Sequence, residues 1–429
     1  MFSIRFLYCF VVLCLNRFES KRIEDSSLDF NEIAYHAEPS QIFLGSPSII
    51  RLSTGRLVAS HDFFGSGYGS QPRNTSIYVS DDNGETWTFT SYIKHSYYAT
   101  LTVYNNMIYA LGIDNDVNAN IIIHRSSDNG VTWIYNGNDE GVILFKGSYF
   151  TSPVPVVMAN GILYRAIELD TGHGYEATII SCDLSKFHEI TEDDPLMSAN
   201  NWRMATPLAF NKEWIPKSLS NITAPAFSNG NVVILPKAGS SDPTQIRILN
   251  VLRFYCAPIG NLAIILELNP TTNTFSFVSI IPFPGGLLRF TIRYDPVTET
   301  YFALANPLTQ HVFLDQRNVL SVTYTKDLVN LTDWKVLVER LLYDDTGFTA
   351  NDSLRYTGFH FVDWQYDHGL STSNKSTCIE WNCDGGEDII FVTRTAYRGA
   401  NSYHNSNRIT YKVLKNYRQL LQKHEQTFH

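Results

Sequence analysis

The sequence predicts an all-β protein, a six-bladed β-propeller in which each blade is a four-stranded antiparallel sheet. Two observations support this prediction: one eight-residue pattern occurs twice, and hairpin units recur along the chain. The pattern S-x-D-x-G-x-T-W occupies residues 80–87 and again residues 126–133. Each copy follows an apolar run and precedes another extended segment, which is the setting of a β-hairpin turn.

The residue types in the pattern are those that a tight turn requires. The Asp side chain accepts hydrogen bonds from nearby backbone N–H groups, and Gly adopts a positive φ angle. Thr then begins the next strand and Trp covers the turn. Weaker copies follow at Ser181-Cys182-Asp183 and at Thr325-Lys326-Asp327, the latter followed by Trp334. Repetition of one turn favours a repeat architecture.

Segments with alternating apolar and polar residues give six similar units, which begin roughly 50–70 residues apart, as blades with loop insertions do. The opening hairpins are predicted at Pro47–Ser60, Thr100–Gly112, Val154–Glu168, Ala226–Pro236 (turn at Asn229-Gly230), Phe290–Ala305 and Phe359–Thr395. A seventh blade is the alternative if the span from Cys182 to Ala224 contains one. Either Ser40–Leu44 or Arg408–Leu414 is expected to close the ring.

The N-terminus predicts export. Residues 1–20 contain a dense apolar run, Phe6–Leu15, which is shorter than the ~20 residues that span a bilayer and is typical of a cleaved signal peptide. We therefore predict a secreted, extracellular protein with one domain over residues 21–429 and no membrane span. Five N-x-S/T sequons agree with this, at Asn74, Asn221, Asn330, Asn351 and Asn374.

Four cysteines remain after removal of the signal peptide, and an even number in an exported protein favours disulfides. The sequence leaves the connectivity open, and the arrangement it suggests pairs Cys378 with Cys383 and Cys182 with Cys256. No zinc-binding pattern is present, so neither a metal nor another cofactor is predicted. The net charge of −9 and the 17% of charged residues argue against nucleic-acid binding. We expect a monomer.

Propellers bind ligands at the central end of their inner strands. The first hairpin ends in His61-Asp62 before the glycine-rich segment 65–67, so we predict His61, with a solvent-facing ring, and Asp62 as the catalytic pair. The substrate-binding candidates are polar or aromatic groups at other strand ends and loops, namely Asp114, Arg165, Glu168, Asn306, Trp364, Gln365, Arg394, Tyr397 and His404. Each also has a structural alternative, for example Trp364 packed between blades.

The repeated turn resembles the Asp-box, or bacterial neuraminidase repeat, of the sialidase superfamily. The resemblance implies the propeller fold over most of the mature chain. Exo-sialidases open their first blade with R-I-P, whose Arg belongs to a triad that binds the sialate carboxylate. This chain has Gly45-Ser46-Pro47 instead, and no Arg in His61-Asp62-Phe63. Other members cleave acidic plant or algal polysaccharides and use a His on the propeller, and His61 is similar in placement.

These observations predict exo-type cleavage of an acidic oligo- or polysaccharide of the uronate or rhamnose type. A lyase needs a base, an acid and a cation, which His61 and either Arg165 or Arg394 provide. A hydrolase instead needs two carboxylates, for which Asp62, Asp114 and Glu168 are candidates. Two alternatives stay open: hydrolysis of terminal sialic acids, and a non-catalytic propeller that binds glycans or proteins.

Overall fold

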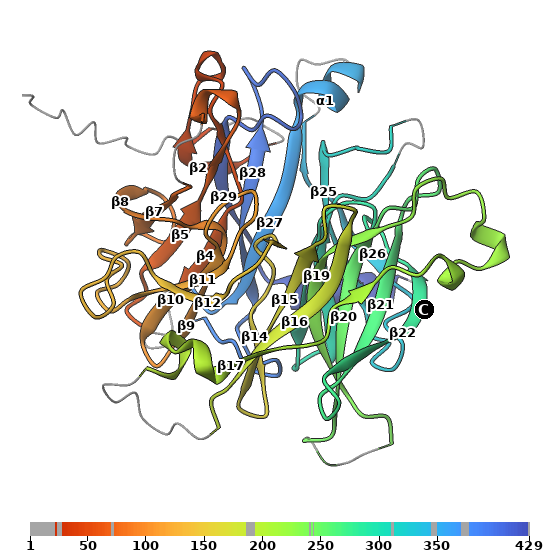
Figure 1. The fold of residues 1–429 in the computed structure, drawn as a ribbon. Helices are drawn as coiled ribbons and strands as arrows, with labels where there is room; N and C mark the ends of the chain where they lie inside the picture. Colours follow the sequence, from red (N-terminus) through yellow and green to blue (C-terminus); the bar gives the residue numbers. More distant parts are fainter. Residues whose placement is uncertain are drawn as a thin grey trace, which may run out of the picture.

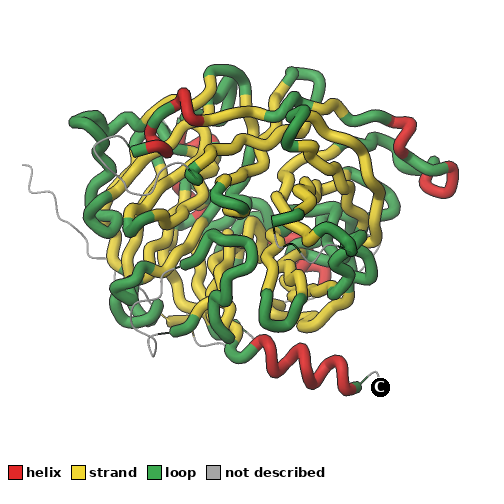
Figure 2. The backbone as a smooth tube through the Cα atoms, turned by 90° about the horizontal axis from the view of Figure 1, so that it is seen from below, coloured by secondary structure: helices red, strands yellow, loops and turns green. Residues whose placement is uncertain are grey.

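Strands are the main regular structure of the computed structural model, which describes residues 22–23, 28–69, 73–185, 194–239, 242, 244–309, 313–344, 350–369 and 377–427 (Figures 1 and 2). The predicted signal peptide, and the sequon at Asn374, lie outside these residues. Six antiparallel sheets form the blades of a six-bladed β-propeller, as predicted. None of the helices among the described residues is long and apolar enough to cross a membrane.

The first three blades follow one another along the chain. Blade 1 contains β4 (Ser48–Arg51), β5 (Leu57–His61), β7 (Thr75–Ser80) and β8 (Thr88–Ile93). Blade 2 contains β9 (Tyr97–Tyr104), β10 (Met107–Ile113), β11 (Ile121–Ser126) and β12 (Val142–Phe145). Blade 3 contains β13 (Tyr149–Phe150), β14 (Val157–Ala159), β15 (Ile162–Asp170), β16 (Tyr175–Asp183), β17 (Trp202–Met204) and β18 (Leu208–Ala209).

The last three blades complete the ring. Blade 4 contains β19 (Phe227–Pro236), β20 (Ile246–Phe254), β21 (Leu262–Asn269) and β22 (Thr274–Pro282). Blade 5 contains β23 (Thr291–Asp295), β24 (Thr300–Ala305), β25 (Val319–Thr325) and β26 (Lys335–Tyr343). Blade 6 contains β27 (Gly358–Asp367), β28 (Asp388–Ala396), β29 (Arg408–Leu414) and β2 (Phe30–Tyr35), with β1 (Arg22–Ile23) at its edge.

Few other elements are present. The short strands β3 (Phe43–Leu44) and β6 (Phe63–Phe64) pair with each other, and the α-helices are α1 (Ala350–Tyr356) and α2 (Tyr417–Gln426), the latter at the C-terminus in Figure 2. Single 3₁₀ turns occupy Glu38–Ser40, Ser66–Tyr68, Pro195–Met197, Ala199–Asn201, Lys212–Trp214 and Lys217–Leu219.

The ring is closed by the two ends of the chain. Strand β29 lies at the predicted residues 408–414 and pairs with β28 on one side and with the N-terminal strand β2 on the other. Figure 1 shows β2, in red, beside the blue strands β28 and β29. The other closing candidate, Ser40–Leu44, supplies only β3, which pairs with β6.

Two details of the predicted blade pattern are settled by the strand pairing. The hairpin predicted at Ala226–Pro236 is wrong: this segment is the single strand β19, and Asn229-Gly230 lies at an irregularity in its pairing with β20. Asn-Gly supplies the backbone freedom that both a turn and a bulge need, so the dipeptide alone does not separate them. The described residues of the span from Cys182 to Ala224 add no blade, because β17 and β18 both pair with β16.

The repeated turns have the predicted hydrogen bonds. In the first, Asp82 accepts from the Thr86 amide at 2.9 Å, and the buried Trp87 ring donates to the Gly84 carbonyl at 3.1 Å. In the second, Asp128 accepts from the Thr132 amide at 2.8 Å. The weaker copy after β25 has the same chemistry, since Asp327 accepts from the Thr332 amide and the Trp334 ring donates to the Leu331 carbonyl.

Asp128→Ala should lower the free energy of unfolding by about 1–3 kcal/mol, because the Thr132 amide and hydroxyl and the Ser126 hydroxyl lose their acceptor. Chemical denaturation measures this change. Asp139→Ala is the matched control in the same blade: Asp139 makes an exposed ion pair with Lys94, which contributes little. Equal stability of both variants would contradict the role of the Asp128 turn.

The hydrophobic core is divided among the gaps between neighbouring blades. Cys182 packs in the cluster formed by blades 2 and 3, whereas Cys256 packs in a separate cluster dominated by blade 4. Both are free and buried, so the predicted Cys182–Cys256 disulfide is wrong. The predicted Cys378–Cys383 disulfide is confirmed.

Candidate functional site

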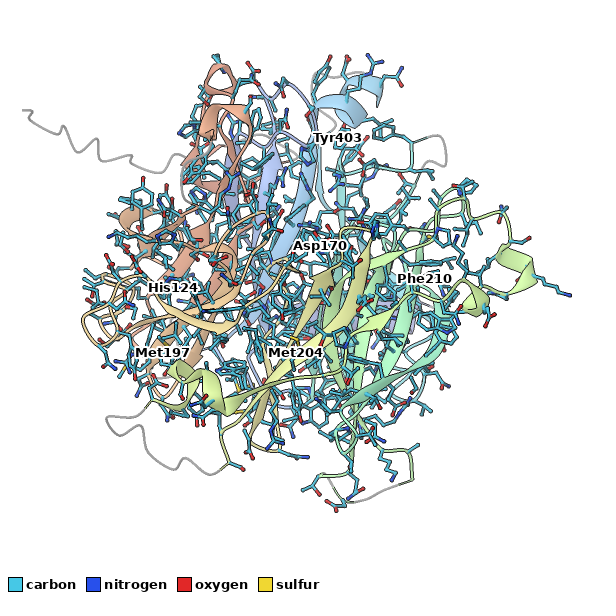
Figure 3. The ribbon with its side chains drawn as sticks, in the orientation of Figure 1. His124, Asp170, Met197, Met204, Phe210 and Tyr403 are labelled. Atoms are coloured by element: carbon cyan, nitrogen blue, oxygen red, sulfur yellow. A yellow bond between two sulfur atoms is a disulfide. The ribbon has the colours of Figure 1, made fainter. Side chains whose placement is uncertain are left out.

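One end of the propeller gathers charged, polar and aromatic side chains from all six blades. The inner strands β4, β9, β19, β23 and β27 begin at this end, and their neighbours β5, β15, β20 and β28 finish there. We call this end the mouth and define it by Asp62, Tyr98, Glu168, Arg289 and Phe361. Tyr403, labelled in Figure 3, lies at the rim, where its amide donates to the Arg355 carbonyl of α1.

Asp62 is a buried carboxylate at the end of β5. Its two oxygens accept hydrogen bonds from the Ser46 amide at 2.8 Å and the Tyr98 amide at 2.9 Å. Burial raises the pKa of Asp62 to about 6, although these amides and the positive charges of Arg394 and Arg289 act in the opposite direction. A Cβ atom at Gly45 would lie 1.6 Å from an Asp62 oxygen. The carboxylate therefore fills the place of any side chain at position 45, where exo-sialidases have their first Arg.

Glu168 is a second buried carboxyl group, near the end of β15. One oxygen accepts from the Gly230 amide at 2.8 Å, and the other has no hydrogen-bond partner among the described residues. Burial raises the pKa of Glu168 to about 7, opposed by the Gly230 amide and by the charge of Arg289. Glu168 is therefore close to half-protonated at neutral pH, as a group that transfers protons should be.

Four arginines, which we call the arginine cluster, lie close together at the mouth: Arg253, Arg289, Arg317 and Arg394. Burial, together with the charges of Arg317 and Arg289, lowers the pKa of Arg394 to about 9, so its charge is retained at neutral pH. Only Arg317 has an ion pair with a carboxylate in the described residues, to Asp315 at 2.7 Å. The cluster therefore carries excess positive charge.

The histidines beside the cluster fix the orientation of the arginines. Arg317 donates to Nδ1 of His360 at 3.1 Å, and Nε2 of that buried ring faces the Tyr403 carbonyl at 3.1 Å. Burial and nearby positive charges hold the pKa of His360 well below its usual range, so the ring is neutral. The loop that carries His404 lies at the mouth as predicted, where its carbonyl accepts from Arg394 at 2.6 Å.

His61 differs from the solvent-facing group that the sequence led us to expect. Its ring is fully buried, stacks on Tyr78 with ring centroids 5.5 Å apart, and contacts Phe63 edge-on at 4.9 Å. Nδ1 donates to the Asp62 carbonyl at 2.9 Å. Burial lowers the pKa of His61 to about 4, which leaves a neutral ring in the core between blades 6 and 1.

Four of the predicted substrate-binding residues contact other parts of the protein instead of facing a ligand site. Arg165 is fully buried and donates to the carbonyls of Tyr98 and Ser152, both at 3.1 Å. Asn306 donates to two backbone carbonyls, Asp114 accepts from Asn120, and Tyr397 is buried in a core cluster. These contacts join loops and blades, although Nε of Arg165 and Oδ1 of Asn306 are buried without a hydrogen-bond partner among the described residues.

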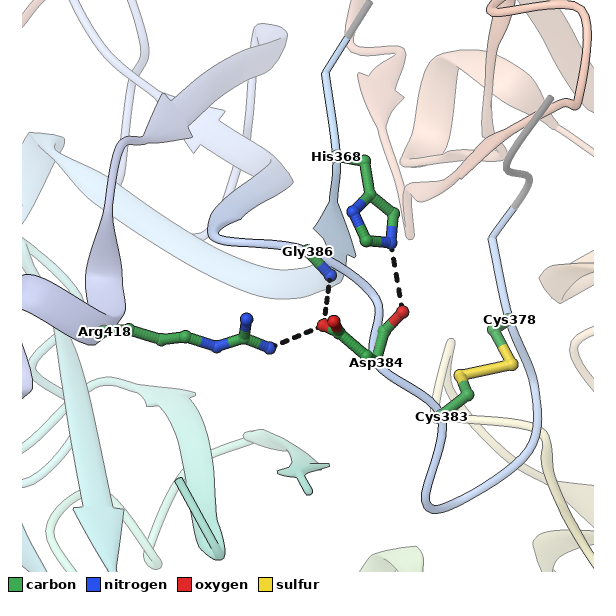
Figure 4. The surroundings of a disulfide bond; sticks show 6 residues. All are labelled: His368, Cys378, Cys383, Asp384, Gly386 and Arg418. Carbon is green, nitrogen blue, oxygen red and sulfur yellow. Dashed lines mark hydrogen bonds and ion pairs between the residues drawn. A yellow bond between two sulfur atoms is a disulfide. The ribbon is translucent and has the colours of Figure 1, made fainter. Parts of the chain in front are cut away.

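Trp364 and Gln365 lie away from the mouth. Trp364 is fully buried between blades and donates to the Thr291 carbonyl, which is the structural alternative that the sequence left open. Gln365 lines a cavity of about 50 Å³ at the other end of β27, beside the Cys378–Cys383 loop. Figure 4 shows how that loop is held: Asp384 accepts from the Gly386 amide and from Arg418 of α2.

Four residues of the mouth were not predicted from the sequence: Arg289, Arg317, Tyr98 and Phe361. Arg289 stands just before the predicted inner strand at Phe290, so its place at a strand start was a signal that pointed to the mouth. Tyr98 and Phe361 have positive φ angles, which no sequence pattern indicates. Among the described residues, no group of three or more His, Cys, Asp or Glu side chains is placed to hold a metal ion.

The fold and the mouth together define a six-bladed β-propeller with a positively charged site at one end. No protein-family model and no curated protein matches the sequence. Solved structures do match. One is a Dyadobacter fermentans protein described as of unknown function, with a TM-score of 0.54, 12% identity, and 91% of this chain and 98% of that chain covered.

Two further structures are of enzymes. Penicillium chrysogenum α-L-arabinanase, complexed with arabinobiose, matches with a TM-score of 0.52 and 13% identity over 92% of this chain and 99% of that chain. Trypanosoma rangeli sialidase matches with a TM-score of 0.53 and 11% identity over 95% of this chain and 59% of that chain. At these identities the likeness shows the fold.

The raised pKa of Glu168 predicts a pH-dependent stability difference between the wild type and Glu168→Gln. Its folded pKa of about 7 exceeds the ordinary 4.5, so between these values the folded protein holds a proton that the unfolded chain has lost. Glu168 therefore destabilises the fold as pH rises through this window, and glutamine does not. The variant should gain about 3 kcal/mol relative to wild type between pH 4 and 8, measured by denaturant titration. A constant difference would contradict the raised pKa.

Proposed function

We propose that this protein is a secreted glycoside hydrolase that cleaves an acidic glycan at the mouth. In this proposal the arginine cluster binds the acidic group of the sugar, and Glu168 and Asp62 transfer the protons. Two of the structures with the same fold are of enzymes named for acting on arabinan and on sialic acid, which supports a carbohydrate as the substrate. The Cys378–Cys383 disulfide and the exposed sequon residues Asn221, Asn330 and Asn351 support secretion.

The observation that carries the proposal is the position of Arg289. Its charge acts on both Asp62 and Glu168, which come from blades 1 and 3, so one guanidinium lies near two buried carboxyl groups. Arg289 is held by a 3.1 Å hydrogen bond from Nε to Asn229, while its Nη1 is buried without a partner among the described residues. A bound carboxylate would supply the missing acceptor.

The two carboxyl groups favour hydrolysis over elimination. With a pKa of about 7, Glu168 retains a proton to give to the leaving glycosidic oxygen, while Asp62, with a pKa of about 6, is mostly ionised and can accept a proton from water. Elimination would need a base for the C5 proton, and the His61 predicted for that role is buried behind Asp62. The arginine cluster would orient the sugar through its acidic group in either reaction.

A substrate screen tests the proposal. The purified protein is incubated with uronate-containing oligosaccharides, sialosides and neutral arabinan, and both new reducing ends and ultraviolet absorbance are followed. Reducing ends without absorbance, from a uronate substrate, are expected for hydrolysis, because only elimination forms an unsaturated uronate. Release of sialic acid would favour the sialidase alternative, and binding without turnover would favour a binding propeller.

A pair of variants connects the activity to the site. Arg289→Met should abolish turnover of the acidic substrate, because the guanidinium whose charge acts on both carboxyl groups is lost. Arg56→Met is the control. Arg56 lies in the turn between β4 and β5 and makes a partly exposed ion pair with Asp81. Activity confined to neutral glycans, or unchanged by Arg289→Met, would contradict the proposal.

A further inference from the structure

The Phe361 side chain takes up the space that two arginines of the cluster face. The guanidinium carbon of Arg289 lies 3.5 Å from the centroid of the ring, and that of Arg394 lies 4.7 Å from it. The Tyr98 ring is stacked further out, at 6.5 Å. Phe361 is only 8% exposed, so the ring is covered by these groups and offers little surface to a sugar. The negative face of an aromatic ring attracts cations, as an acidic group would.

The backbone at Phe361 is in a conformation that a bulky residue rarely adopts. Its φ angle is +54°, and the pairing of β27 with β28 shifts register between His360 and Asp363. A bulge of this kind redirects one side chain, and positive φ in a non-glycine residue is costly and concentrates at functional sites. The bulge therefore directs the Phe361 ring toward the arginines at a conformational cost.

Little free space remains beside the ring. The cavity bordered by Ser152, Arg289 and Phe361 has a volume of about 10 Å³, enough for about one water molecule. A carboxylate on a sugar does not fit there while the ring stays in place. The space between the Phe361 ring and Arg289 is therefore filled in this structure, although the cluster carries excess positive charge.

We propose that Phe361 is a gate that determines which ligands enter: its ring occupies the anion position beside Arg289 and Arg394, and the acidic group of the ligand must replace it. This inference rests on the proposed function and adds the residue that controls access. A carboxylate gives both guanidiniums charge-assisted hydrogen bonds in return for the lost ring contacts, whereas neutral hydroxyls give weaker bonds. The fraction of protein molecules in which the Phe361 ring is displaced also sets the apparent affinity for the acidic ligand.

Phe361→Gly tests the gate, because glycine accepts the positive φ angle and removes the ring. The first measurement needs no ligand: modification of Arg289 and Arg394 by phenylglyoxal, quantified by peptide mass spectrometry. Both should react at least about 10-fold faster in the variant than in the wild type. The second is calorimetry with D-glucuronate, which should bind at least about 10-fold more tightly to the variant. Methyl glucoside should bind measurably to the variant only.

Two further variants make each outcome decisive. Phe64→Leu is the matched control: Phe64 contacts Arg394, at 3.9 Å, so its loss should leave the labelling of Arg289 unchanged. Phe361→Leu keeps most of the volume, and should give intermediate labelling even if the glycine variant is unstable. Unchanged labelling in both Phe361 variants would overturn the gate and leave the proposed function standing. Faster labelling without glucuronate binding would overturn the role of the acidic group, and with it the proposed function.

Discussion

Glu168→Gln should lower the turnover of the acidic substrate about 10²–10⁴-fold, the range typical of a residue that transfers a proton in the transition state. Glutamine still accepts the hydrogen bond from the Gly230 amide, but it has no proton of the right acidity to give to a leaving oxygen. Steady-state kinetics should show the loss in kcat with little change in KM, because the arginine cluster is intact.

Asp170→Asn provides the control for this prediction. Asp170 ends the same strand, β15, and is labelled in Figure 3, but its side chain accepts a hydrogen bond from the Gly172 amide in a surface turn. The same carboxyl-to-amide change should leave kcat unchanged there. Full turnover in the Glu168→Gln protein would remove Glu168 from the mechanism and leave Asp62 as the remaining carboxyl candidate at the mouth.

His61→Ala should lower the free energy of unfolding by about 2–4 kcal/mol, because it leaves a cavity where a buried ring stacks on Tyr78 and contacts Phe63. Activity per folded molecule should stay near that of the wild type, since the Ser46 and Tyr98 amides still hold Asp62. Denaturation curves and active-fraction kinetics on the same preparation separate the two effects.

His61→Phe distinguishes packing from hydrogen bonding at this position. Nε2 of His61 is buried without a partner among the described residues, and the Asp62 carbonyl also accepts from the Gly45 amide at 2.7 Å. Phenylalanine should therefore retain wild-type stability or exceed it. A folded, stable His61→Phe protein without activity would return His61 to the catalytic role that the sequence suggested.

The blades could be predicted because their signals are local. The Asp-Gly-Thr turns satisfy their own hydrogen bonds within a few residues, and the alternating strands bury one face against a neighbouring blade. β19 was misjudged because Asn-Gly serves both a turn and a bulge. Strand β2 was missed as the ring-closing partner because its pairing with β29 joins residues at opposite ends of the chain.

The candidate site was predicted only in part, since it depends on which side chains point into the mouth and which point into the core. Asp62, Glu168 and Arg394 were named and do lie at the mouth. His61 lies on the core-facing side of β5 with Leu57 and Ala59, because side chains two residues apart in a strand point to the same face. This spacing is visible in the sequence, but the position of His61 at the strand end led to the prediction of a catalytic role instead. Arg289 and Phe361 are in contact only because the propeller places blades 5 and 6 side by side, and a pattern along the sequence does not indicate such a contact.

The way the ring closes also constrains how the protein is made. Strand β2 precedes blades 1 to 5 in the chain, and its partner β29 follows them, so the sixth blade can be completed only after all five have been synthesised. Until then the edge of β2 that pairs with β29 is unpaired, and unpaired edges favour association with other chains. Nascent chains stalled before residue 408 should therefore depend on chaperones, whereas chains that include β29 can pair it with β2 in a single sheet.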